Sequence, residues 1–153
     1  MDDNTSRTWI EISLDNIAHN YEQLRGRTDP AKFLGVVKAD AYNHGAVKVA
    51  SMLQSMGCDY LAVATIFEAE ELRRAGITMP ILILGYTPPE YASRLISGGI
   101  TQAIGSLDMA ERMSENAVKA GGKVKTHIKI DSGMGRLGFS CVCGEDHLDE
   151  IVR

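Results

Sequence analysis

The chain has 153 residues, of which 44% are hydrophobic and 24% are charged. A chain of this length can bury roughly 70% of its unfolded surface, which favours one domain with a real core and argues against general disorder. The net charge of −4 comes without a cluster of Lys and Arg, so nucleic acid is not an expected partner.

Apolar periodicity predicts strands and helices that alternate along the chain. The expected strands cover residues 8–12, 33–37, 60–64, 81–84, 100–104 and 124–130, and the expected helices cover 14–25, 45–56, 65–76, 87–98, 106–120 and 145–152. Ser13 is expected to cap the first helix, and Thr65 and Thr87 each precede a Glu by three residues, which predicts two capping boxes. Repeated strand–helix units imply a parallel sheet.

Two architectures fit this alternation. One is an open doubly wound sheet, and the other is part of a (β/α)8 barrel, which needs more strands than this chain supplies. Spacing alone does not separate them. His127, Lys129 and Asp131 alternate along the last strand and would share one face, where charged groups are costly unless they are paired or functional. That pattern favours a barrel interior.

Lys38 is the sharpest candidate for chemistry. In both architectures ligands gather at the carboxyl ends of the strands, and Lys38 directly follows the apolar run 33–37. Desolvation there disfavours the charged amine, and an uncharged amine attacks an aldehyde to form a Schiff base. The alternative is a lysine that merely extends to water from the end of a strand.

Arg136 lies in a glycine-rich segment, 131–138. Glycines let the backbone turn sharply and approach a ligand, and a fixed guanidinium suits an anionic oxygen. The alternative is a solvated arginine on a surface turn. Gly133, Gly135 and Gly138 also satisfy the dinucleotide fingerprint G-x-G-x-x-G. Because no helix-forming stretch follows and the segment comes after the last strand, we do not expect a dinucleotide site.

Three cysteines are a small and odd number, which does not fit a disulfide framework. They are expected to be reduced thiols, as in a cytosol. Cys141 and Cys143 with His147 match no common zinc spacing, so no metal is expected. The acidic N-terminus lacks the apolar stretch of a secretory signal, and no apolar run is long enough to cross a bilayer. We therefore expect a cytoplasmic protein without a membrane partner.

Four segments carry a resemblance that covers essentially the whole chain. Residues 36–45 (VVKADAYNHG) and 129–138 (KIDSGMGRLG), together with 8–12 and 16–20, are similar to segments of the alanine racemases, which depend on pyridoxal 5'-phosphate (PLP). The resemblance implies a PLP-binding (β/α)8 (TIM-type) barrel of which residues 1–153 are the incomplete N-terminal part. A C-terminal β-rich domain would lie beyond these residues.

The resemblance also implies roles for individual residues. Lys38 would bind PLP as a Schiff base and act as one of two catalytic bases. Tyr42 would hydrogen-bond the cofactor phosphate, and Leu84 would pack against the cofactor. Arg136 would contact the phenolic oxygen of the cofactor and help to position the substrate. Lys129 would be the lysine that can be N-carboxylated, and its carbamate would then orient Arg136.

The activity implied is the interconversion of L-alanine and D-alanine, which supplies D-alanine for peptidoglycan, in a homodimer. The second base would be a tyrosine of the C-terminal domain, so residues 1–153 alone are expected to be inactive. A serine or other amino-acid racemase of the same group, an amino-acid decarboxylase, a non-catalytic PLP-binding barrel protein and an α/β domain of another role remain as alternatives.

Overall fold

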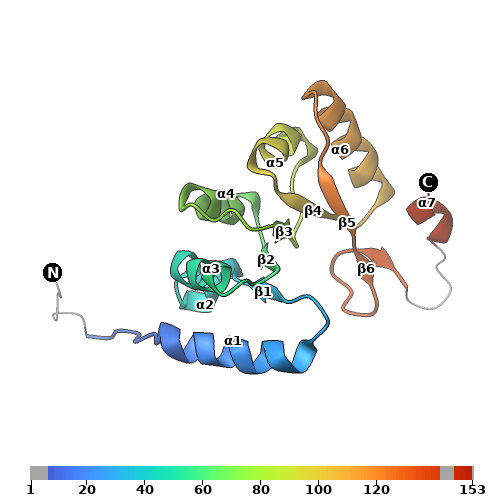
Figure 1. The fold of residues 1–153 in the computed structure, drawn as a ribbon. Coiled ribbons are helices and arrows are strands. Elements are labelled where there is room, and N and C mark those ends of the chain that lie inside the picture. The colour runs from blue at the N-terminus through green and yellow to red at the C-terminus, as the bar shows by residue number, and fades with distance from the viewer. Residues whose placement is uncertain (1–6, 142–146, 153) are drawn as a thin grey trace.

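The computed structural model describes residues 7–141 and 147–152, and it contains a five-stranded parallel sheet. The strands follow one another across the sheet in the order β1-β2-β3-β4-β5 (Figure 1). Their bounds are Leu34–Val36, Tyr60–Val63, Ile81–Ile83, Thr101–Ile104 and Lys125–Ile128. A separate parallel pair, β6 (Ile130–Asp131) and β7 (Phe139–Ser140), follows the fifth strand.

Helices connect the successive strands of the five-stranded sheet, and further helices precede β1 and follow β7. Their bounds are α1 Leu14–Thr28, α2 Lys38–Asn43, α3 Ala46–Ser55, α4 Ile66–Arg74, the 3-10 helix η1 Pro89–Tyr91, α5 Ala92–Gly98, α6 Leu107–Lys119 and α7 Leu148–Val152. The predicted helix 145–152 corresponds to α7, although its first two residues lie outside the described ranges. Within those ranges, no helix combines the length and the apolar character needed to cross a bilayer.

Helices α3, α4, α5 and α6 lie along one side of the sheet (Figure 1). The buried core lies between them and the strands, where Leu61, Ile81, Ile83 and Ile104 pack against helical residues such as Leu72. A doubly wound sheet carries helices on both faces and reverses its strand order, whereas a barrel keeps the strands in chain order with all helices outside. The fold is therefore part of a TIM-type barrel, as the resemblance implied.

The inner face of the sheet is concave. The hydroxyl of Tyr60, on β2, lies 2.6 Å from the hydroxyl of Thr101, on β4, although β3 runs between the two strands. The ring of Tyr60 also lies 5.9 Å from the ring of His127, on β5. Contacts between side chains two and three strands apart agree with a sheet that curls toward closure. The prediction that His127 points into a barrel is thus confirmed, but Asp131 belongs to β6 and turns toward its own loop.

The local helix signals were mostly right. The hydroxyl of Ser13 accepts a hydrogen bond from the N–H of Asn16, and Thr65 and Glu68 form both halves of a capping box. The box predicted at Thr87 is wrong, because the helical segment begins at Pro89 and Thr87 is buried. Pro89 restricts the residue before it to an extended backbone, so the helix cannot begin at Pro88.

The strand predicted at residues 8–12 is also wrong. This segment forms no strand in the structure, and Trp9 and Ile10 are 68% and 69% exposed. Its apolar alternation is real, but a strand needs a neighbour for its backbone hydrogen bonds, and within the described residues none runs beside it.

Arg73 of α4 joins the ends of two βα units. Its guanidinium donates hydrogen bonds to the carbonyls of Gly98 (2.8 Å), Ile77 (2.8 Å) and Met79 (2.9 Å). We expect Arg73→Ala to lower the free energy of unfolding by about 2–4 kcal/mol, because half-buried carbonyls lose a charged donor. Urea unfolding would measure this.

The neighbouring Arg74 provides the matched control. Its side chain is 71% exposed and lies 4.0 Å from Glu70, a distance at which an ion pair contributes little. Arg74→Ala should change the free energy of unfolding by less than about 0.5 kcal/mol. Equal losses of unfolding free energy for the two variants would show that the hydrogen bonds of Arg73 to the carbonyls do not account for its contribution to stability.

Candidate active site

Lys38 lies at the carboxyl edge of the sheet, directly after β1. Val37, which precedes it, is buried, and its N–H donates to the carbonyl of Ala62 at 2.9 Å, which continues the pairing of β1 with β2. Lys38 itself is half-buried. The strand therefore delivers the amine to the edge where parallel α/β folds bind their ligands.

The chain after Lys38 forms a left-handed helical turn that the sequence did not predict. Residues Ala39, Asp40, Ala41, Tyr42 and Asn43 all have positive φ, between 50° and 65°. Non-glycine residues pay about 1–2 kcal/mol each for this conformation, so a run of five persists only where surrounding contacts impose it. None of these residues is glycine, which is why composition gave no signal.

Hydrogen bonds at both ends hold this turn. At its end, the carboxylate of Asp40 accepts the N–H of Ala46 at 2.7 Å, and the carbonyl of Asp40 accepts the N–H of Gly45 at 3.0 Å. At its start, the N–H of Ala39 donates to the carboxylate of Glu68 at 2.8 Å. From the sequence Glu68 was assigned only to a capping box, because a contact 29 residues away leaves no local pattern.

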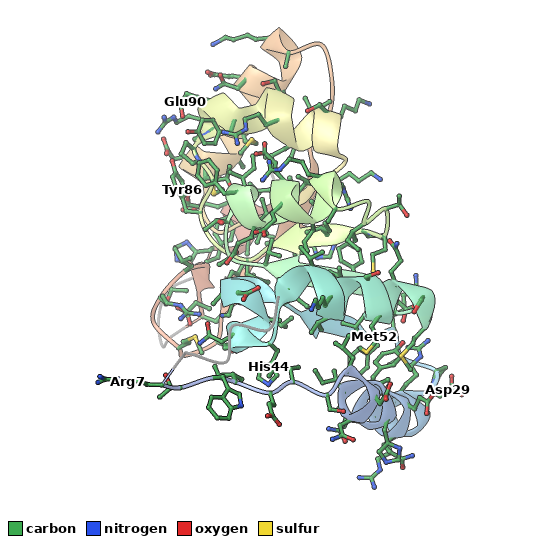
Figure 2. All side chains as sticks on the ribbon, turned by 90° about the vertical axis from the view of Figure 1, so that its left-hand side faces the viewer. Arg7, Asp29, His44, Met52, Tyr86 and Glu90 are labelled. Atoms are coloured by element: carbon green, nitrogen blue, oxygen red, sulfur yellow. The ribbon has the colours of Figure 1, made fainter. Side chains whose placement is uncertain are left out.

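Tyr42 is part of this turn, and His44 directly follows it. The Nζ atom of Lys38 is 5.9 Å from the centre of the Tyr42 ring, and Tyr42 is 58% exposed. The Nδ1 atom of His44 lies 3.0 Å from the carbonyl oxygens of Ala41 and Tyr42. His44 faces the N-terminal segment (Figure 2), and Ile10 and His44 line the same cavity of about 520 Å³.

The glycine-rich segment wraps around the carboxylate of Asp131. One oxygen of Asp131 accepts the N–H groups of Gly133 and Gly135, both at 3.0 Å, and the other accepts the N–H of Arg136 at 2.8 Å. These bonds favour the charged carboxylate and lower the pKa of Asp131. The N–H groups are thus already engaged, and β7 follows instead of a helix, which agrees with rejecting a dinucleotide site.

Three of the five predicted site residues line one cavity of about 260 Å³. They are Leu84, after β3, Lys129, after β5, and Arg136, in the glycine-rich loop. The two cationic side chains make this cavity suitable for an anionic group. Lys38 and Tyr42 are not among its described lining residues; they lie together at the other edge strand, β1.

Backbone atoms pack closely beside this cavity. A Cβ atom at Gly105, after β4, would lie 2.9 Å from the Cα and N atoms of Gly138, and Gly138 has a φ of 128°. Glycine at both positions therefore lets the Arg136 loop lie against the end of β4. Cys141 is an exposed free thiol, and Cys143, the other half of the rejected zinc pattern, lies outside the described residues.

Comparisons with known proteins show the family of this chain. Residues 12–151 match the family described as alanine racemase, N-terminal domain. The chain is 49% identical over 144 residues to an alanine racemase of Clostridium perfringens, which covers 94% of this chain and 37% of that relative. A solved structure, alanine racemase of Clostridium difficile 630 in complex with cycloserine, superimposes with a TM-score of 0.89 at 46% identity and covers 97% of this chain and 40% of that one.

A histidine racemase of Leuconostoc mesenteroides is also similar, with a TM-score of 0.79 at 29% identity over 84% of this chain and 35% of that one. The chain thus spans little more than a third of the length of these relatives. Nearly all of its own length takes part in the match, from the segment before α1 to α7. This chain belongs to the family of alanine racemase N-terminal domains.

Proposed function

We propose that these residues form the N-terminal part of a PLP-dependent alanine racemase. The observation that carries the proposal is that the carboxyl ends of the parallel strands present both Lys38, directly after β1, and a cavity lined by Lys129 and Arg136. By this proposal residues 1–153 belong to the barrel domain, and a β-rich domain follows them.

The side chains present at this edge fit PLP. Its aldehyde requires an amine, which Lys38 supplies, and its phosphate and phenolic oxygen require positive charge or hydrogen-bond donors. Tyr42 offers a hydroxyl close to Lys38, and Arg136 offers a guanidinium. Leu84 adds an apolar wall to the cavity of Arg136, against which a flat ring can pack.

PLP supplies electron withdrawal from the carbon atom that loses its proton. Lys38 would hold the cofactor, and its amine would take up the α-proton on one face of the substrate and, once protonated, return it. Racemisation also needs a proton carrier on the opposite face. By the resemblance this is a tyrosine from the C-terminal domain of a dimer partner, so we propose that residues 1–153 alone do not racemise alanine.

Arg136 would neutralise an anionic oxygen of the cofactor or of the substrate carboxylate. Its backbone is fixed by Asp131, while its side chain is exposed toward the cavity that Lys129 shares. Two positive charges in one cavity repel each other. N-carboxylation of Lys129 would replace one of them with a negative carbamate, so it would convert this repulsion into an ion pair that orients Arg136.

Covalent mapping tests the proposal. The full chain would be incubated with PLP and reduced with borohydride, and the modified peptide would be identified by mass spectrometry. We expect the label on Lys38. A label on another lysine, with Lys38 unmodified, would contradict the assignment.

The substrate needs a separate assay, because a histidine racemase shares this fold. Turnover of alanine, serine and histidine by the full-length, PLP-loaded protein that contains residues 1–153 would be compared. We expect alanine to have the highest kcat/KM. If another amino acid had the highest kcat/KM, the proposed PLP-dependent racemisation would stand, but alanine would not be the preferred substrate.

A further inference from the structure

We infer that Glu68 is a positioning residue for Lys38, an inference that rests on the proposed function. Glu68 belongs to α4 and does not touch the amine itself. Its carboxylate instead binds the backbone directly after Lys38, on the neighbouring strand's side of the site.

The two carboxylate oxygens of Glu68 have different partners. Oε2 accepts the N–H groups of Ala64, at 2.7 Å, and Thr65, at 2.9 Å, and so completes the capping box of α4. Oε1 accepts the N–H of Ala39 at 2.8 Å. In a capping box the Glu side chain has to accept only the N–H of the N-cap residue, here Thr65. The contact with Ala39 is therefore additional to helix capping.

The contact controls the backbone at Lys38. The N–H of Ala39 and the C=O of Lys38 belong to one planar peptide unit, so a bond that orients this N–H also fixes ψ of Lys38. Ala39 is in addition the first residue of the strained left-handed turn. Without a partner for its N–H, the chain could relax toward an ordinary conformation and carry the amine away from the sheet edge.

The contact with Ala39 also follows directly after the last backbone hydrogen bond between the β1 and β2 segments. The pairing of β1 with β2 reaches the N–H of Val37, which donates to the carbonyl of Ala62. Two residues further along the chain, the N–H of Ala39 donates to a side-chain carboxylate instead of a backbone carbonyl. Glu68 thus links the segment that follows β1 to the start of α4, and the linked segment begins with the residue next to Lys38.

Glu68→Gln separates positioning from capping. An amide has one acceptor oxygen, and if that oxygen keeps the two capping bonds, its NH2 group faces the N–H of Ala39, donor against donor. Thr65→Ala is the matched control, because it removes the hydrogen bond from the N–H of Glu68 to the Thr65 hydroxyl but leaves Ala39 bound. Both variants weaken the same capping box, and only Glu68→Gln disturbs Ala39.

The readout is capture of PLP by Lys38, followed through the absorbance of the bound cofactor and its pH titration, and through borohydride labelling. For Glu68→Gln in the full chain we expect PLP affinity to fall about tenfold, the factor for one lost charge-assisted hydrogen bond. The pH titration of the bound chromophore should also move. Thr65→Ala should lower the urea midpoint and leave both PLP readouts unchanged.

Three results would overturn the inference. They are wild-type PLP affinity and titration in Glu68→Gln, equal loss of affinity in both variants, and a wild-type protein in which PLP does not label Lys38. Only the last of these also removes the proposed function. Should Glu68→Gln not fold, Glu68→Asp provides the same test, since its shorter carboxylate cannot reach both partners and is expected to lower PLP affinity to a smaller extent.

Discussion

Replacing Lys38 with alanine is expected to lower kcat for alanine racemisation at least about 10³-fold in the full-length, PLP-loaded racemase that the proposed function implies. The substitution removes both the amine that holds the cofactor and the proton carrier on one face of the substrate, and a positioned acid–base group alone contributes about 10²–10⁴-fold. A coupled assay that detects D-alanine formed from L-alanine measures the effect. Added methylamine should restore part of the activity, because a free amine can take over some of the chemistry.

The matched control is Lys119→Ala. Lys119 lies in the last turn of α6, is exposed, and is remote from β1 in the order of the sheet. Its loss should leave kcat and KM unchanged. If Lys38→Ala retained more than a tenth of the wild-type kcat, Lys38 would not be the catalytic amine.

Replacing Asp131 with alanine should lower kcat/KM about 10²-fold with little change in the amount of folded protein. Its carboxylate accepts three backbone N–H groups of the Arg136 loop. Without these bonds the backbone of Arg136, and so its guanidinium, is no longer held in place. If the guanidinium of Arg136 moves by about 1 Å as a result, the rate is expected to fall on the order of 10²-fold. Steady-state kinetics would measure the loss, and Ser132→Ala, at the exposed neighbouring position, is the control.

The same carboxylate predicts a pH dependence of stability. The N–H groups of its loop lower the pKa of Asp131 below its value in the unfolded chain, so its contribution to stability is present above the unfolded value of about 3.9. That contribution is lost as the pH falls through the lower, folded pKa. In urea unfolding, wild type and Asp131→Ala should differ at pH 7 and converge below about pH 4. A difference that stayed constant down to pH 2 would contradict this account.

Local sequence patterns determined much of the secondary structure. The alternation of strands with amphipathic helices, the cap at Ser13 and the capping box at Thr65 depend on neighbours a few residues apart. A single chain segment therefore contains the information. The glycine-rich segment was likewise recognisable as a loop, and it carries the candidate site residue Arg136. The capping box predicted at Thr87 was wrong, because Pro89 restricts the backbone of the residue before it.

Other features depend on bonds between distant segments. The left-handed turn after Lys38 contains no glycine, and its first N–H bonds Glu68, 29 residues away. The strand expected at 8–12 had the right alternation but no neighbouring strand among the described residues. In both cases the conformation is decided by a partner for the backbone N–H groups, which local sequence does not specify.

The sequence by itself therefore determined that this protein is built from parallel strand–helix units, and it named Lys38 and Arg136 as the residues to examine. Only the tertiary structure decided that the strands lie in chain order with the helices along one face, and that Leu84, Lys129 and Arg136 share a cavity. The physical reason is that the periodicity of a strand or helix reports which of its faces is buried. Which neighbour buries that face, and in what order the strands pair, is fixed by long-range backbone hydrogen bonds and packing.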